Sequence, residues 1–228
     1  MDTFCNNTKE ITMGYILFDL DGTLLNTRDG IVTCIQKAIA KAGVIIDDLS
    51  LLERHIGPPL KAGFIKYYNF DDKTADDAVE EFRKYYQEAG IPGSHPYEGI
   101  EACLKELKDQ GHHLIVATSK PEVVAKAFLR HFHLDTYFED ICGSVETGDH
   151  VRVTKGQVIE FALKHNQIQE TKDVTMVGDR SHDVLGALEC QVKCVGVLYG
   201  FGSRKELLEA GAVHVVSNTK ELAEYFNK

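Results

Sequence analysis

The chain has 228 residues, a length that fits one core with a modest insertion better than two full-sized domains. With 43% hydrophobic and 26% charged residues, the composition is that of a globular protein and argues against disorder, collagen-like repeats and a coiled coil. The formal net charge is −10, from 25 Lys and Arg against 35 Asp and Glu, and so acidic a chain is a poor binder of nucleic-acid backbone.

No apolar run reaches the roughly 18 residues that cross a bilayer, so we expect no membrane span. The segment Met1–Thr12 is polar and contains two acids, which is unlike a signal peptide. The ten histidines show no metal-ligand spacing. The scattered cysteines complete no zinc-site pattern and indicate reduced thiols, most of them buried, in a cytoplasmic protein. They are Cys5, Cys34, Cys103, Cys142, Cys190 and Cys194.

Short apolar runs alternate with longer segments of helical spacing. Tyr15–Phe18 is apolar throughout, which is typical of a strand buried on both faces of a parallel sheet. Further expected strands are 114–117, 174–177 and 194–197, with a weaker one at 213–216 and a short one at 141–142. The expected helices are 100–110, 121–131, 156–165, 182–190 and 204–211. This alternation predicts an α/β fold with a doubly wound parallel sheet, a Rossmann-like core.

One interval departs from this rhythm, because about 95 residues separate the first two strands where a βαβ unit takes about 30. The surplus has no strand pattern, and its apolar residues recur at helical spacing, as at Ile31, Ile35, Ala38 and Ile39. An insert that follows the carboxyl end of a strand lies over the usual ligand crevice of such sheets, where it can act as a lid. The predicted division is a core of 1–27 and 92–228 and an all-helical cap of 28–91.

Carboxylates stand in pairs at the ends of two expected strands. Asp19 and Asp21 follow the first strand, two residues apart and before a glycine turn, which is electrostatically costly although Asp-Gly is also a common turn. Asp179 and Asp183 form a second pair at a strand-to-helix turn.

Hydroxyl groups and one lysine stand at matching positions. Thr118 and Ser119 end the second strand, where they can also cap the following helix. Lys155 heads a helix, and there it opposes the helix macrodipole unless it meets an anion. All these positions fall at the edge where an open parallel sheet gathers its ligand groups, so we expect one site built from them.

At these residues the chain resembles the haloacid dehalogenase superfamily of phosphohydrolases. Asp-Leu-Asp-Gly-Thr-Leu at 19–24, Thr118, Lys155 and Gly-Asp-x-x-x-Asp at 178–183 stand in that family's order, over nearly the whole chain. The chain is also similar to the phosphoglycolate-phosphatase and 5′-nucleotidase-like branch. The phrases that suggest this branch are 55–60, 119–121, Tyr137-Phe138 with Gly143-Ser144, and 199–202.

The resemblance implies a phosphatase with the catalytic residues Asp19, Asp21, Thr118 and Lys155. Asp19 is the nucleophile that attacks phosphorus, and water then cleaves the acyl phosphate. Asp21 protonates the leaving oxygen and afterwards activates water. Lys155 bridges nucleophile and phosphoryl group, while Thr118 donates to the phosphate oxygens.

The resemblance also implies Mg²⁺ as cofactor, which offsets the repulsion between an anionic nucleophile and an anionic phosphate. The candidate metal ligands are Asp19, Asp21 through its main-chain carbonyl, Asp179 and Asp183. Of these, Asp183 is better suited to orient water or Lys155 than to bind the metal directly.

The implied substrate is a small phosphorylated metabolite, and we expect a phosphoglycolate phosphatase-like activity, with a 5′-nucleotidase as the alternative. The candidate substrate-binding residues are Thr118, Ser119 and Lys155 in the core and Arg54 and His55 in the cap. The two cap residues equally fit a packing role. We expect no nucleic-acid polymer and no membrane as partner, and the sequence is silent on the oligomeric state.

Other activities on the same scaffold fit less well. A sugar phosphomutase would use the same phosphoaspartate and return the phosphoryl group to its substrate. A dehalogenase needs one aspartate and no metal, which would leave Asp21 and Asp179 without a role. A phosphonate hydrolase needs a Schiff-base lysine in the cap, and Lys61 and Lys66 lack a supporting motif there. A non-catalytic binding protein would be expected to have lost at least one of the charged site residues, and all four of them are present: Asp19, Asp21, Lys155 and Asp179.

Overall fold

The computed structural model describes residues 14–148 and 150–227. The expectations for Met1–Thr12 and for Cys5 lie outside these residues. The cysteines within the described ranges are free, and all but Cys190 are buried. In the same ranges, no helix has the length and apolar character that a bilayer crossing needs.

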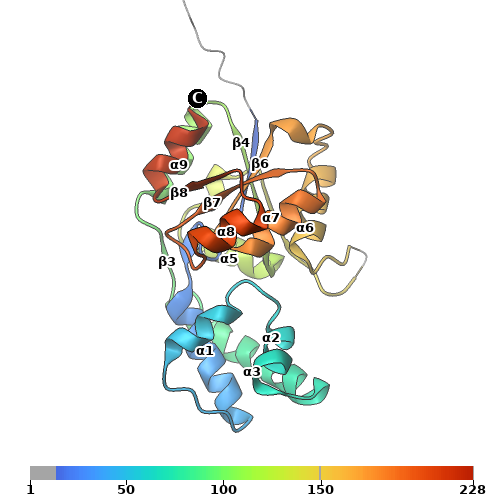
Figure 1. Cartoon of the computed structure of the whole chain (residues 1–228). Helices are drawn as coiled ribbons and strands as arrows, with labels where there is room; N and C mark the ends of the chain where they lie inside the picture. Colours follow the sequence, from blue (N-terminus) through green and yellow to red (C-terminus); the bar gives the residue numbers. More distant parts are fainter. Residues whose placement is uncertain (1–13, 149, 228) are drawn as a thin grey trace, which may run out of the picture.

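A six-stranded parallel sheet forms the centre of the molecule, in the order β5-β4-β1-β6-β7-β8 (Figure 1). This arrangement confirms the predicted α/β fold. The expected strand at 141–142 is a full five-residue strand, and the strand expected at 114–117 runs on through the polar residues that follow it. The strands are β1 (Tyr15–Phe18), β4 (His113–Pro121), β5 (Asp140–Ser144), β6 (Val174–Gly178), β7 (Lys193–Val197) and β8 (His214–Val216).

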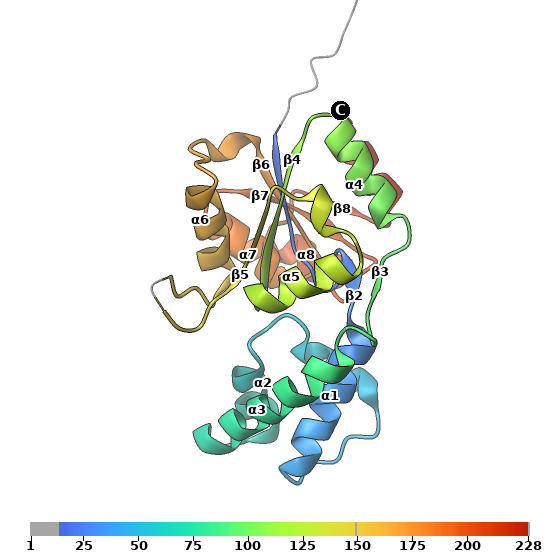
Figure 2. The ribbon, with the colours of Figure 1, turned by 180° about the vertical axis from the view of Figure 1, so that it is seen from behind.

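Helices cover both faces of the sheet, as the continuous apolar character of β1 requires. Ile16 and Phe18 point into one hydrophobic layer and Leu17 into the other. The first layer is closed by α4 (Ile100–Asp109), α5 (Glu122–His131) and α9 (Thr219–Phe226), and Figure 2 shows α4 and α5 on this side. The second is closed by α6 (Lys155–His165), α7 (Ser181–Glu189) and α8 (Arg204–Ala210), which Figure 1 shows in front of the sheet. The sequence analysis did not predict α9. Two short 3-10 helices, η2 (Asp135–Tyr137) and η3 (Thr171–Asp173), complete the core.

The segment 28–91, here called the cap, folds as helices beyond the carboxyl ends of the strands (Figures 1 and 2). The predicted apolar stripe of its first helix, from Ile31 to Ile39, is buried. The division into core and cap at these boundaries stays a prediction. The cap elements are α1 (Arg28–Lys41), η1 (Leu49–His55), α2 (Leu60–Tyr68) and α3 (Asp72–Ala89).

The chain leaves the core and returns to it along one short antiparallel ribbon. β2 (Leu25–Asn26) pairs with β3 (His95–Pro96), and the amide of Gly30 donates to the carbonyl of Gly93 at 3.0 Å. The two crossings therefore lie side by side, and the cap is joined to the core along one edge.

Candidate active site

The predicted acidic, hydroxyl and lysine side chains meet at the carboxyl edge of the sheet. Because β4, β1 and β6 are neighbours, the chain places Thr118, Asp19 and Asp179 beside one another at the strand ends. Lys155 begins α6, and Asp183 lies in the first turn of α7. None of these five residues is more than 4% exposed, so they form a buried polar cluster.

Lys155 joins two of the carboxylates. Its Nζ lies 2.8 Å from Asp19 Oδ1 and 2.7 Å from Asp183 Oδ1. Burial alone would lower the pKa of Lys155, but Asp183 and Asp19 outweigh burial and raise the pKa above its ordinary value. The unfavourable placement of a lysine at a helix start is thus offset by two anions, and the residue carries its charge into the site.

Asp179 is held through one oxygen only. Its Oδ2 accepts from the amide of Phe201 at 2.7 Å. Gly22, at a φ of +81°, passes so close that a Cβ there would overlap the Asp179 carboxylate, which explains the glycine after Asp21. Asp179 Oδ1 is buried and has no hydrogen-bond partner among the described residues. A fully buried carboxylate oxygen without a donor is costly unless it binds a cation.

The cluster has more negative than positive charge. Burial raises the pKa of Asp19 to about 7, with Lys155 opposing this rise and Asp183 adding to it. Burial, together with Asp183 and Asp19, also raises the pKa of Asp179 well above its ordinary value. When all three carboxylates are ionised, Lys155 neutralises only one of them. A divalent cation would supply the missing charge, and carboxylate and carbonyl oxygens are the ligands that Mg²⁺ prefers, so these residues fit such an ion.

Asp183 is already engaged by other donors. Its Oδ2 accepts from the amide of Arg180 at 3.0 Å, and its Oδ1 pairs with Lys155. These contacts support a role in orienting Lys155. Ligand atoms of Asp19, Asp183 and His182 also lie within 4.8 Å of one another. His182 was not among the predicted site residues; burial lowers its pKa, which favours the neutral imidazole.

The raised acid pKa values predict a pH-dependent effect of Mg²⁺ on stability. Because Asp19 and Asp179 titrate higher in the folded protein than their ordinary 3.8, the folded state binds more protons than the unfolded state between about pH 4 and 7. Their ionisation therefore lowers the free energy of unfolding as the pH rises through this range. A cation that binds the ionised cluster reverses the loss. We expect Mg²⁺ to raise the melting temperature more at pH 7.5 than at pH 5.0.

Thermal melts in EDTA and in Mg²⁺ at the two pH values measure this difference. The Asp179→Asn variant is the control and should show a much smaller Mg²⁺ effect at pH 7.5. An equal Mg²⁺ effect at both pH values, or an undiminished effect in the variant, would contradict the assignment of the ion to this cluster.

Asp21 pairs with Lys120, which lies in the segment 119–121 but was not among the predicted site residues. Lys120 Nζ lies 2.9 Å from Asp21 Oδ1 and 3.0 Å from Oδ2, and the lysine is buried. No local rule predicts this contact, because the register of β4 against β5 shifts between Ala117 and Pro121, so the alternation of faces along a regular strand does not carry from Thr118 to Lys120.

Thr118 and Ser119 differ in their access to a ligand. The Thr118 hydroxyl accepts from the amide of Lys120 at 3.2 Å, and its hydrogen bond to Asp19 helps to lower the pKa of that carboxyl. Ser119 is half-buried. Thr118 therefore lies beside the predicted nucleophile, as a phosphate-binding hydroxyl would.

The two predicted cap residues have different surroundings. His55 is buried, its Nε2 lies 2.9 Å from Tyr68 Oη, and burial lowers its pKa to about 4, so it is an uncharged imidazole packed inside the cap. The guanidinium carbon of Arg54 lies 4.1 Å from the ring centroid of Tyr67, and Arg54 Nε has no hydrogen-bond partner among the described residues. Arg54 is the one of the two with unused donor capacity.

The cap approaches the core next to the cluster. Arg180 Nη1 donates to the carbonyl of Ile56 at 3.1 Å. Gly57, at a φ of +100°, leaves no room for a Cβ against the ring of His182. The loop that follows η1 therefore rests directly on the start of α7.

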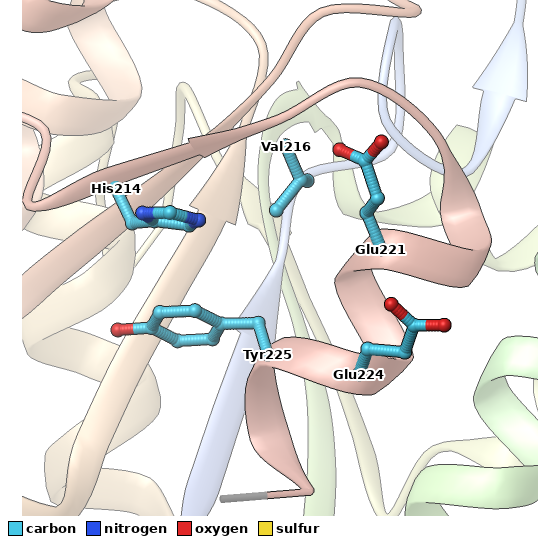
Figure 3. A pocket seen from close by; sticks show the side chains of 5 residues that line it. All are labelled: His214, Val216, Glu221, Glu224 and Tyr225. Atoms are coloured by element: carbon cyan, nitrogen blue, oxygen red, sulfur yellow. The ribbon is translucent and has the colours of Figure 1, made fainter.

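A surface pocket of about 270 Å³ lies elsewhere, between β8 and α9 (Figure 3). His214 stacks on Tyr225 with ring centroids 5.1 Å apart. Glu221 accepts from the amide of Ser217 at 2.7 Å and so serves the start of α9. The polar groups of this pocket are used in local structure, so it does not compete with the buried cluster as a reactive site.

Comparison with known proteins agrees with the geometry. A family model described as haloacid dehalogenase-like hydrolase matches residues 16–197. Over 207 residues, 91% of this chain and 92% of the relative, the chain is 41% identical to the 5′-nucleotidase of Pseudomonas aeruginosa. It is 32% identical over 210 residues to the Tyrosine-protein kinase PtkA of Mycobacterium tuberculosis, which covers 92% of this chain and 70% of that protein. It is 28% identical over 216 residues to the phosphoglycolate phosphatase of Pseudomonas fluorescens, which covers 91% of this chain and 77% of that protein. A crystal structure of a predicted phosphatase from Clostridium acetobutylicum has a TM-score of 0.89 and 44% identity, and covers 94% of this chain and 98% of that one.

Proposed function

The chain belongs to the haloacid dehalogenase-like hydrolases and is a phosphatase, and we propose that it hydrolyses small phosphomonoesters, with Mg²⁺, through a phosphoaspartate at Asp19. The observation that carries the proposal is the contact of Asp19 with Lys155, at 2.8 Å, inside a cluster of carboxylates whose excess negative charge a divalent cation would balance. The phosphatase class follows from the family; the nucleophile and the metal are the parts proposed.

In the first step, an oxygen of Asp19 attacks phosphorus as the bond from phosphorus to the leaving oxygen breaks. Asp21, when protonated, gives its proton to that oxygen, so the alcohol leaves neutral. In the second step, Asp21 takes a proton from water while the water oxygen attacks phosphorus. The bond between phosphorus and Asp19 breaks, and the products are inorganic phosphate and the original carboxylate.

Positive charge must lie close to both the Asp19 carboxylate and the phosphoryl group, because these two anions repel each other. Lys155 supplies one charge and is fixed by Asp183. Asp19, Asp179 through its open Oδ1 and the Asp21 carbonyl would hold the ion, which supplies the remaining charge when bound. Thr118 and nearby amides would then orient the phosphate oxygens.

As substrates, we place nucleoside 5′-monophosphates ahead of phosphoglycolate. The sequence analysis favoured phosphoglycolate. However, the relative named 5′-nucleotidase is 41% identical to this chain, and the relative named phosphoglycolate phosphatase is 28% identical. Arg54 over Tyr67, which is 38% exposed, offers a charged and an aromatic group for a ribose and base. His55 would support this pair from within the cap.

A phosphate-release panel tests the proposal. We expect Mg²⁺-dependent release from nucleoside 5′-monophosphates above that from 2-phosphoglycolate and sugar phosphates, and its loss in EDTA. The Arg54→Ala variant should raise KM for nucleotides by roughly tenfold and change p-nitrophenyl phosphate hydrolysis little. Substrate conversion without free phosphate would indicate a mutase. Transfer from ATP to a tyrosine peptide, without hydrolysis of any monophosphate, would contradict the proposed function.

A further inference from the structure

Lys120 is a buried cation that no step above uses. Its side chain is 4% exposed, and its Nζ reaches both carboxylate oxygens of Asp21, at 2.9 and 3.0 Å. The same Nζ donates to the hydroxyl of Tyr86 at 2.7 Å. It also lies 4.5 Å from the ring centroid of Phe128. A lysine is rarely buried so fully. Among the residues that the structure describes, all three hydrogen bonds of its Nζ go to Asp21 or to Tyr86.

The partners of Lys120 come from different parts of the molecule. Asp21 follows β1, and Phe128 lies on α5 of the core, whereas Tyr86 lies on α3 of the cap. Tyr86 stacks on Phe128 with ring centroids 5.6 Å apart and planes within 18° of parallel. The ammonium group therefore links the predicted acid–base residue to a contact between cap and core.

We infer that Lys120 and Tyr86 are positioning residues for Asp21, and that the contact of the cap with the core helps to hold the Asp21 carboxylate in place for proton transfer. This inference rests on the proposed function, because the proposed function assigns Asp21 as the proton donor. Two donated bonds fix the orientation of a carboxylate that would otherwise rotate about its last bond. Without the Tyr86 hydroxyl, Lys120 would lose one of its hydrogen-bond partners, and its hold on Asp21 would weaken.

A purely structural role for Lys120 predicts something different. A loosened buried ion pair lowers activity for all substrates alike, through the fraction of folded protein or the shape of the site. A misplaced proton donor matters only where the leaving group needs a proton. Phenyl phosphate needs one more than p-nitrophenyl phosphate, and the two differ little in shape.

The test compares kcat/KM for these two aryl phosphates, because this ratio reports the steps up to cleavage of the leaving-group bond. In the Lys120→Met variant, we expect the loss on phenyl phosphate to exceed the loss on p-nitrophenyl phosphate by roughly tenfold, within the range that general acids contribute. Tyr86→Phe should shift the ratio the same way by about threefold, since Lys120 keeps Asp21 and loses only the hydroxyl. Asp21→Asn is the reference for full loss of the proton donor.

Lys126→Met is the control. Lys126 lies on α5, where it forms an ion pair with Glu122, and it is not among the site residues. Its ratio between the two substrates should equal that of the unmodified protein. Equal losses on both substrates in Lys120→Met and in Tyr86→Phe would overturn the inference. If Lys120→Met fails to fold, Lys120→Gln and Tyr86→Phe decide the question. An inactive unmodified protein, or an active Asp19→Asn variant, would instead refute the proposed function.

Discussion

Replacing Asp19 by asparagine is expected to lower phosphatase turnover by on the order of 10⁴-fold or more, because the amide cannot form the phosphoryl intermediate. The fold should survive the change. Asparagine has the same size, it can still accept from the amide of Leu20, and its neutral side chain relieves the crowding of carboxylates around Lys155. Phosphate release, with far-ultraviolet circular dichroism to verify folding, measures the effect.

The intermediate itself can be sought in the unmodified protein. Quenching during turnover and reducing with borohydride converts a phosphorylated aspartate into homoserine, which mass spectrometry locates in the sequence. We expect homoserine at position 19 and at no other acid. Asp47→Asn, at an exposed acid of the cap, is the control and should keep both turnover and the label. Turnover in Asp19→Asn within tenfold of normal, with no label in the unmodified protein, would contradict the mechanism.

Replacing Lys155 by methionine is expected to damage both catalysis and stability. The change leaves Asp19, Asp179 and Asp183 buried together without the ammonium that contacts two of them. Removing one partner of a buried ion pair costs about 3–5 kcal/mol in the free energy of unfolding. Losing a charge aimed at the reacting group should lower turnover by on the order of 10³-fold. Urea unfolding in EDTA at pH 7.5 and phosphate release measure the two effects separately.

A second substitution separates the two roles of Lys155. In the Lys155→Met/Asp183→Asn variant, one uncompensated charge is removed, so part of the lost stability should return while turnover stays low. Lys164→Met, at an exposed lysine later on the same helix, should change neither property. If Lys155→Met unfolds at the same urea concentration as the unmodified protein, the contacts of Lys155 are not those of a buried ion pair.

The strands, and the gathering of the candidate site residues at one sheet edge, could be predicted because each follows from a local rule. β1 is apolar on both faces, so its burial between two layers of helices is evident from the sequence, and the polar residues that follow it must lie at the sheet edge. The meeting of Asp19 with Lys155 required one further step, the shared edge of parallel strands. No tertiary detail was needed for either conclusion.

Other features depend on contacts between distant parts of the chain. A lysine at position 120 gives no sign in the sequence that it reaches Asp21, because the bend of the loop after β1 decides this. The environment of His55 depends on rings of α2 that surround it, so a candidate ligand and a packed imidazole look alike in sequence. The last helix, α9, did carry local signals. The Asn218 side chain caps it by accepting from the amide of Glu221, and Asn218 Nδ2 donates to Glu221 Oε1. The sequence analysis did not use these signals.

The paired crossing of β2 and β3 has a consequence for how such a protein can diversify. Since Leu25 stands opposite Pro96, a tight turn could join the two strands directly and would leave every strand of the sheet in register. The helical segment is thus a cassette with adjoining ends, which recombination could exchange whole. New substrates could then be acquired by swapping that cassette, with the reaction machinery inherited unchanged.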